Sequence, residues 1–324
     1  MKRQLAVETL PPAKVNLFLE VLGKRHDGYH DLESIFMGVD RRDRLVIEKS
    51  EETGVRLFCD WRRDVRSSLR EVTEERSLEV LQIPNDQRNL VVRALLAFTE
   101  AYQIRGGFDV QLEKTIPAGA GMGGASSDAA AALRAAALLC DVPLDDPQLW
   151  TIAADLGSDI PFFLGPRHLP QVTTVNSAIA TGRGEKLEYF HSARIPALVI
   201  VYPPASLSTA EVYRHCIVPG EPRSSSPCHS FLLGSPLHRG EELFFNRLLE
   251  PARQLSSWID RTLSAIASTG LCHVAMTGSG SACFALSRSV AHAKQIVRRI
   301  ASRRLGVCFV ARPARLPAPV RLLT

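Results

Sequence analysis

Apolar and polar residues alternate clearly over residues 13–22, the first strongly patterned stretch of the chain. A period of two predicts a half-buried β-strand. Its apolar face is formed by Val15, Leu17, Leu19 and Val21. Lys14 and Asn16 lie on the opposite face, where a lone lysine is usually solvated. Because Lys14 also stands at the start of the strand, after two prolines, it is placed where active sites often lie.

Further strands and helices follow from similar patterns. Alternation predicts a strand at 108–113, and a fully apolar run predicts a buried strand at 197–202. Residues 128–140 are rich in Ala and Leu and contain no Gly or Pro, which predicts a helix. Residues 90–102 form an amphipathic pattern with Asn89 as its N-cap. Helices and strands mixed in this order indicate an α+β fold.

A glycine-rich loop connects the predicted strand at 108–113 to the predicted helix at 128–140. Glycine lets the backbone approach a ligand closely and turn its N–H groups inward. The start of a helix adds partial positive charge at the same place. We therefore predict that the loop is a phosphate cradle. It consists of Pro117, Ala118, Gly119, Ala120, Gly121, Met122, Gly123, Gly124, Ala125, Ser126 and Ser127.

The loop by itself leaves other interpretations open. Gly119, Gly121 and Gly124 have the spacing of a dinucleotide-binding loop. That site needs a second apolar strand after the helix, whereas residues 141–148 are typical of a turn. A Walker A loop also disagrees, because no Lys-Ser or Lys-Thr pair follows the glycines. A tight structural turn is a further alternative. The two serines would cap the helix or contact phosphate oxygens or a metal.

Three other polar segments change the picture. Residues 23–32 contain a turn signal followed by Tyr29 and His30. These two side chains form either a half-packed surface turn or a stacking platform beside a hydrogen-bonding group. Asp159 lies in a Gly-Ser-Asp turn, where an aspartate is more often an N-cap than a catalyst. Residues 60–88 mix both signs of charge, which indicates a solvated loop or an exposed helix.

The composition is that of an ordinary globular protein. The 324 residues are 45% hydrophobic and 23% charged, and this length predicts two domains. The formal net charge of +5 suits anionic small molecules and does not indicate nucleic-acid binding. Seven scattered cysteines predict reduced thiols in a cytoplasmic protein. No apolar run approaches the roughly 20 residues that span a membrane, and the first residues leave no room for a targeting peptide.

Several motifs, in this order and spacing, resemble the GHMP kinase superfamily. The similarity spans nearly the whole chain and is strongest to the branch that phosphorylates a cytidine-diphosphate sugar alcohol. The motifs are Pro12-Ala13-Lys14-Val15-Asn16-Leu17, Lys24-Arg25-His26-Asp27-Gly28-Tyr29-His30, Asn89-Leu90, the glycine-rich loop, Gly157-Ser158-Asp159, Thr181-Gly182-Arg183-Gly184-Glu185, Ser208-Thr209, Asn246 and Thr277-Gly278-Ser279-Gly280-Ser281.

This resemblance implies a two-domain α+β fold of the GHMP kinase type. Residues 1–170 would form an N-terminal ATP-binding domain, ribosomal S5 domain 2-like, with an unusual βαβ crossover. Residues 171–324 would form a ferredoxin-like C-terminal substrate domain. The site would lie in the cleft between the two.

The resemblance also implies an activity. ATP, with Mg²⁺, would phosphorylate the 2-hydroxyl of 4-(cytidine 5'-diphospho)-2-C-methyl-D-erythritol, a step of non-mevalonate isoprenoid synthesis. Lys14 and Asp159 would be the catalytic pair, and Asn89 and Leu90 would border the adenine. Tyr29 and Tyr213 would sandwich the cytosine, His30 would bond its edge, and Asn16 and Thr209 would hold the diphosphate and the sugar alcohol. Ser127 is a candidate metal contact, although the ligand set is not identified.

Two other functions stay open at this point. Another GHMP kinase, such as a mevalonate or homoserine kinase, would keep the loop but has no use for the Asp-Gly-Tyr-His stretch at 27–30. A ligand sensor on the same fold need not keep both Lys14 and Asp159, and this chain keeps both.

Overall fold

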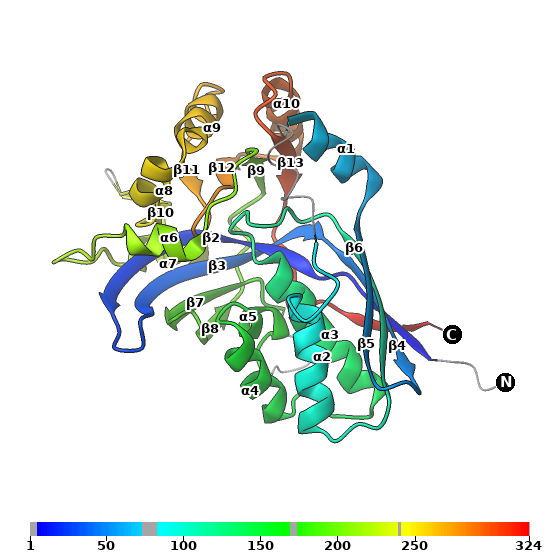
Figure 1. The fold of residues 1–324 in the computed structure, drawn as a ribbon. Coiled ribbons are helices and arrows are strands. Elements are labelled where there is room, and N and C mark those ends of the chain that lie inside the picture. The colour runs from blue at the N-terminus through cyan, green and yellow to red at the C-terminus, as the bar shows by residue number, and fades with distance from the viewer. Residues whose placement is uncertain (1–4, 73–82, 169–173, 239–240, 324) are drawn as a thin grey trace.

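A computed structural model describes residues 5–72, 83–168, 174–238 and 241–323. In these ranges the chain forms three β-sheets (Figure 1). Strands β2 and β3 cross the middle of the molecule, with helices α2–α5 on one side and the C-terminal sheet with α8–α10 on the other. None of the described helices is long and apolar enough to cross a membrane.

The first sheet has five strands in the order β14-β1-β4-β6-β5. Strands β5 and β6 are parallel neighbours, and the connection between them contains α1 and α2. This is the crossover that the resemblance implies. The strands are β14 (Val320–Leu323), β1 (Ala6–Thr9), β4 (Arg44–Ser50), β6 (Gly107–Lys114) and β5 (Gly54–Trp61).

The second sheet, in the order β10-β2-β3-β7-β8, carries the catalytic candidate Lys14. Strand β3 was not predicted, because its polar start looks like a continuation of the preceding loop. The hairpin β7–β8 pairs with β3, so the predicted domain boundary at residue 170 does not coincide with a change of sheet. The strands are β10 (Phe245–Asn246), β2 (Pro12–Lys24), β3 (His30–Arg42), β7 (Ser177–Gly182) and β8 (Lys186–Phe190).

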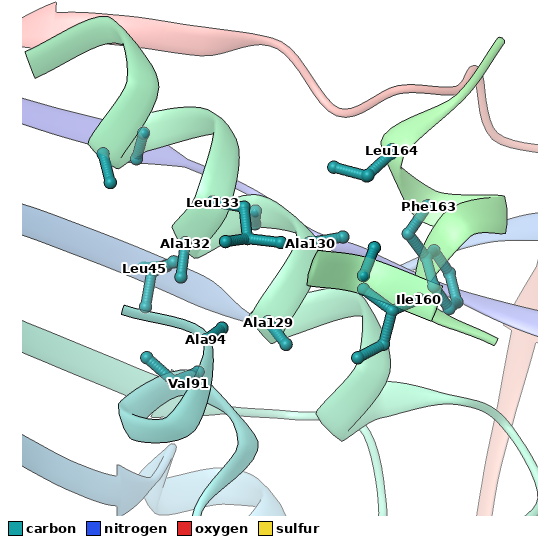
Figure 2. Packing of buried hydrophobic residues seen from close by; sticks show 14 of the residues in the cluster. Leu45, Val91, Ala94, Ala129, Ala130, Ala132, Leu133, Ile160, Phe163 and Leu164 are labelled. Carbon is teal, nitrogen blue, oxygen red and sulfur yellow. The ribbon is translucent and has the colours of Figure 1, made fainter. Parts of the chain in front are cut away.

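Helix α3 (Gly124–Leu139) forms the centre of the N-terminal core. Its alanines lack long side chains, so α2 (Leu90–Ala101) and α5 (Ile160–Leu164) can pack closely against it (Figure 2). Helix α4 (Pro147–Leu156) packs on α2 beside them. The tight packing holds the start of α3 in place. The start of α3 and the start of α5 carry, respectively, the glycine-rich loop and Asp159.

The third sheet has the order β11-β12-β9-β13 and is antiparallel throughout. With α9 and α10 it gives the β-α-β-β-α-β sequence and strand order of a ferredoxin-like fold, as the resemblance implies. The elements are β9 (Ala197–Tyr202), α6 (Thr209–Arg214), α7 (Ser226–Leu233), α8 (Leu249–Leu255), α9 (Ser257–Ala267), β11 (Val274–Met276), β12 (Cys283–Ser287), α10 (Val290–Ala301) and β13 (Val307–Ala311).

Two segments behave differently from their sequence patterns. Helix α1 (Arg63–Val72) belongs to the mixed-charge segment, yet Val65 is buried and packs with the C-terminal sheet. Residues 73–82 of that segment lie outside the described residues. The basic end of the chain, residues 312–324, carries three prolines, and the sequence predicts an extended tail there; the described part, 312–323, is instead held against the body of the protein. It bonds back to the second sheet through Ala314 and Leu316 and ends in β14, beside β1.

Candidate active site

Lys14 projects from β2 toward Asp159, at the start of α5. Its Nζ lies 3.3 Å from the Asp159 carboxylate. The Lys14 side chain is almost fully buried, and its ammonium also lies over the Phe36 ring at 4.7 Å. The lysine is therefore not on a solvated face. Asp159 has the sequence position of an N-cap but makes no capping hydrogen bond, so its carboxylate is available to Lys14 and to a ligand.

Asn16, two residues along β2, fixes the position of the lysine. Lys14 Nζ donates to Asn16 Oδ1 at 2.6 Å. The Asn16 amide group donates in turn to Ser34 Oγ at 2.9 Å, which sets the orientation of the side chain. The Thr277 hydroxyl accepts from the Asn16 backbone N–H and donates to Gly121 O at 3.1 Å. One buried network thus joins β2, the glycine-rich loop and the hairpin between β11 and β12.

The glycine-rich loop packs backbone to backbone against that hairpin. Gly121 has φ +71°, and a Cβ there would lie 2.2 Å from the carbonyl oxygen of Thr277. Gly123, also in the left-handed region with φ +69°, is the N-cap of α3. A Cβ on Gly123 would meet Phe163 and Lys14 at about 3 Å. Glycine is therefore required at both positions, and the loop lies against the catalytic candidates.

The two serines of the loop do not cap the helix, contrary to one of the sequence interpretations. Helix α3 begins at Gly124, so Ser126 and Ser127 lie inside its first turn. Ser126 faces the cleft. Ser127 Oγ is buried and has no hydrogen-bond partner among the described residues. Because Ser127 does not line the cleft, its contact with a phosphate or a metal ion stays a prediction.

A buried ion cluster lies beside the glycine-rich loop and includes Asp128, in the helix that follows the loop. Lys114, at the end of β6, bonds to the carboxylates of Asp43 and Asp128. Burial opposes the charged form of Lys114, but the two carboxylates outweigh it and raise the pKa of Lys114. Burial first, and then the nearby charge of Asp43, raise the pKa of Asp128. The cluster was not predicted from the sequence, although Lys114 continues the inward face of the alternating strand.

Aromatic and basic side chains form the opposite end of the site. The ring of His30 stacks on that of Tyr213, with the ring centres 5.2 Å apart. Tyr29 is 56% exposed, and the Arg183 guanidinium lies over its ring at 5.0 Å. The Thr209 hydroxyl bonds to that of Ser279 at 2.9 Å. Burial raises the pKa of Tyr213, as does the neighbouring charge of Asp159, so the phenol stays protonated.

A single cleft of about 870 Å³ brings most of the predicted residues together. The lining contains both catalytic candidates, all five substrate candidates and loop residues 119–126. It does not include Pro117, Ala118 or Ser127. Asn89 caps α2 by accepting from Val91 N and donating to Pro84 O. Neither Asn89 nor Leu90 lines this cleft, so their contact with adenine stays a prediction.

The family descriptions GHMP kinases N terminal domain and GHMP kinases C terminal match residues 89–165 and 232–305. A 4-diphosphocytidyl-2-C-methyl-D-erythritol kinase from Rhodopirellula baltica is 46% identical over 288 residues, 87% of each chain. A kinase of the same name from Deinococcus radiodurans is 34% identical over 308 residues, 94% of this chain and 92% of its own. The chain belongs to the 4-diphosphocytidyl-2-C-methyl-D-erythritol kinase family.

Solved structures agree with this family. A crystal structure of 4-(cytidine 5'-diphospho)-2C-methyl-D-erythritol kinase has 33% identity and a TM-score of 0.71, covering 94% of this chain and 98% of its own. A homoserine kinase from Cytophaga hutchinsonii, at 17% identity and a TM-score of 0.67, covers 99% of this chain and 98% of its own. That second similarity shows the fold alone. Both findings agree with the two-domain GHMP kinase fold expected from the motifs.

The cleft of this member of the 4-diphosphocytidyl-2-C-methyl-D-erythritol kinase family also contains residues to which the sequence assigned no role. Lys24 and Arg183 line it beside Tyr29 and His30, although the sequence motifs named them without a role. Phe36 lies under the lysine, on the unpredicted strand β3. The signal for Lys24 and Arg183 was present in the sequence, because both are basic residues beside turn glycines in motifs already singled out.

Proposed function

We propose that this protein transfers the γ-phosphoryl group of ATP to the 2-hydroxyl of 4-(cytidine 5'-diphospho)-2-C-methyl-D-erythritol, in the non-mevalonate route to isoprenoids. The observation that carries the proposal is that one cleft holds the Lys14–Asp159 pair and, directly against it, the glycine-rich loop. This arrangement occurs in a chain that belongs to the kinase family of that name.

Phosphoryl transfer asks a protein mainly to position the reactants and to neutralise charge. The backbone N–H groups of the loop, with the start of α3, would hold the β- and γ-phosphates. The acceptor oxygen attacks the γ-phosphorus, the bond to the β-phosphate bridging oxygen breaks, and ADP leaves. Asp159 accepts the proton of the attacking hydroxyl. Lys14 orients that carboxylate and offsets the growing negative charge.

Mg²⁺ fits this site as an ion that ATP brings with it. Among the described residues no three His, Cys, Asp or Glu side chains form a metal cluster. This agrees with the usual binding of Mg²⁺ through substrate phosphates, waters and one or two protein ligands. The partnerless Ser127 hydroxyl would hold the ion or the phosphate beside it. When bound, the ion neutralises phosphate charge.

We also propose the remaining roles. Tyr29 stacks on the cytosine, with Tyr213 on the other side and His30 at the base edge. Because His30 already stacks on Tyr213, the base would enter beside this pair. Asn16 and Thr209 hold the diphosphate and the methylerythritol. The substrate is a small molecule, neither nucleic acid nor membrane, and the protein would act in the cytoplasm.

A coupled assay for ADP release tests the function directly. The cytidyl substrate is compared with mevalonate, homoserine and unrelated alcohols, each with ATP and Mg²⁺. We expect rapid ADP release with the cytidyl substrate alone and a new 2-phosphate signal by ³¹P NMR. Faster turnover of mevalonate or homoserine would assign the chain to another GHMP kinase activity. Binding of the cytidyl substrate without ADP release would favour the ligand-sensor interpretation.

A further inference from the structure

Arg183 projects into the substrate cleft from the turn between β7 and β8. The turn packs against the segment that carries Asp159, because a Cβ on Gly184 would lie 3.9 Å from the side chain of Ser158. The Arg183 side chain is 30% exposed. The side chain extends from this hairpin of the second sheet to the rim of the cleft, where Tyr29 and His30 lie.

The backbone of the same turn fixes the position of Arg183. Its N–H donates to Glu185 Oε2 at 2.7 Å, which closes the turn. The guanidinium Nε lies 4.0 Å from the same carboxylate oxygen, beyond hydrogen-bond distance. The guanidinium instead lies over the Tyr29 ring at 5.0 Å. No hydrogen bond links the side chain of Arg183 to the part of the chain that the structure describes.

The absence of side-chain hydrogen bonds, with only a 4.0 Å ion pair to Glu185, distinguishes Arg183 from two other cations of the cleft. Lys14 is paired with Asp159, and Arg214 is paired with Glu211 at 3.1 Å. An arginine has five N–H donors in a fork that matches phosphate oxygens. A half-buried guanidinium that lines a cleft and uses none of them on its own protein fits an anionic ligand.

Further positive charge lies at the same end of the cleft. Lys24 faces His30 across the β2–β3 pair and lines the cleft too. The charge of Arg183 also reaches Asp27. Burial acts to raise the pKa of Asp27, but the hydrogen bond from Tyr29 N, the hydrogen bond and charge of Arg25 and, last, the charge of Arg183 together lower it. The end of the cleft thus combines an exposed aromatic ring with cations, which is the chemistry that recognises a nucleotide base attached to phosphate.

We propose that Arg183 binds the diphosphate group of the cytidyl substrate, while the Tyr29 ring beneath it supports the base. This inference rests on the function proposed above. It makes Arg183 a specificity-determining contact that recognises the diphosphate rather than the base or the ATP. In the competing role, Arg183 acts only by holding the Tyr29 ring in place. Its loss would then weaken the binding of cytidine, CMP and CDP equally.

Binding of three related ligands to the full chain separates these roles. Cytidine, CMP and CDP are titrated calorimetrically into the wild type, Arg183→Ala and Arg183→Lys. We expect Arg183→Ala to lower the affinity for CDP about tenfold or more, which is the scale of a hydrogen bond to a charged group. Cytidine should change by less than about twofold, since it has no phosphate. Lysine keeps the charge but loses the fork, so Arg183→Lys should recover only part of the CDP affinity.

Arg299→Ala is the matched control. Arg299 is exposed on α10 and does not line the cleft, and its substitution removes the same positive charge as Arg183→Ala. It should leave all three affinities unchanged. An equal loss for cytidine, CMP and CDP in Arg183→Ala would overturn the proposal in favour of ring support. Unchanged CDP binding would overturn it outright. A raised KM for ATP with normal CDP binding would assign the contact to the ATP phosphates instead.

The steady-state kinetics keep this inference distinct from the proposed function. With the cytidyl substrate, Arg183→Ala should raise its KM about as much as it weakens CDP, with kcat and the KM for ATP almost unchanged. If the wild type binds CDP through Arg183 but releases no ADP, the proposed function fails and the diphosphate site stands. If the wild type turns over normally and Arg183→Ala changes neither KM nor CDP binding, the proposed function stands and the diphosphate contact of Arg183 is wrong.

Discussion

The two ends of the cleft are built in different ways. At the end that we propose for ATP, the nucleotide end, the loop at 117–127 offers its backbone, held in place by the close approach of Gly121 to Thr277. At the acceptor end, the site is made of side chains such as Tyr29, Arg183 and Tyr213, which come from separate elements. The proposed catalytic pair is close to both ends, because Lys14 lies beside Gly123 of the loop and the charge of Asp159 acts on Tyr213.

The difference explains which end the sequence reveals. A site made of backbone needs small residues at fixed spacing, so it appears as a continuous motif. A site made of side chains appears only as scattered aromatic and basic residues until the fold assembles them. We therefore expect changes at the nucleotide end to act through backbone geometry, and changes at the acceptor end to act through single contacts.

The largest effect should come from the proposed catalytic pair, which belongs to neither end and acts on the chemical step itself. Asp159→Ala and Lys14→Ala should each lower kcat by about a hundredfold or more, the usual scale for acid–base groups. Lys14→Met, which keeps the buried volume, guards against a loss of folding. Turnover is measured by ADP release and folding by thermal unfolding. Near-normal turnover of a folded variant would remove that residue from the chemistry.

Gly121→Ala tests the backbone end. The added Cβ would need to move away from Thr277 O, and the residue would be strained at φ +71°. Strain of this kind costs about 1–3 kcal/mol, so we expect the KM for ATP to rise about tenfold, with the cytidyl KM less affected. Gly220→Ala is the control, because a Cβ there meets nothing within 4 Å. A normal KM for ATP in Gly121→Ala would mean that the triphosphate binds elsewhere.

Tyr29→Ala tests the side-chain end. Stacking of a base on an aromatic ring contributes about 1–3 kcal/mol, so the KM for the cytidyl substrate should rise about tenfold while the KM for ATP stays constant. Tyr29→Phe keeps the ring and should behave like the wild type. Equal increases in both KM values would mean that Tyr29 is a structural residue. The two ends of the cleft would then not bind separate substrates in the way proposed.

The smallest effect should come from pH. Burial, and then the charge of Lys24, lower the pKa of His30 below its usual 6.5. The imidazole therefore stays neutral at neutral pH, and the cytidyl KM should be constant from pH 8 down to about 6.5. As the pH falls further, the unfolded chain gains this proton first, so the group then reduces stability. An NMR titration of His30 checks the direction, and a pKa above 6.5 would contradict it.

The prediction from sequence succeeded where residue type alone limits the structure. The alanine helix, the strand at 197–202 and the glycine-rich loop were all recognised, although α3 begins four residues before the predicted 128. It failed where polar residues are buried. Lys14 and Asn16 look solvated by pattern, and only the contact with Asp159 and Thr277 across the fold explains their burial.

Strand β14 gives the molecule an unusual order of assembly. Its residues Val320–Leu323 pair with Ala6–Thr9 at the edge of the first sheet. During translation, the partner of β1 therefore emerges from the ribosome only after the other described strands and helices have been synthesised. Until β14 is made, β1 is an edge strand of the first sheet, and unpaired edges invite association between nascent chains.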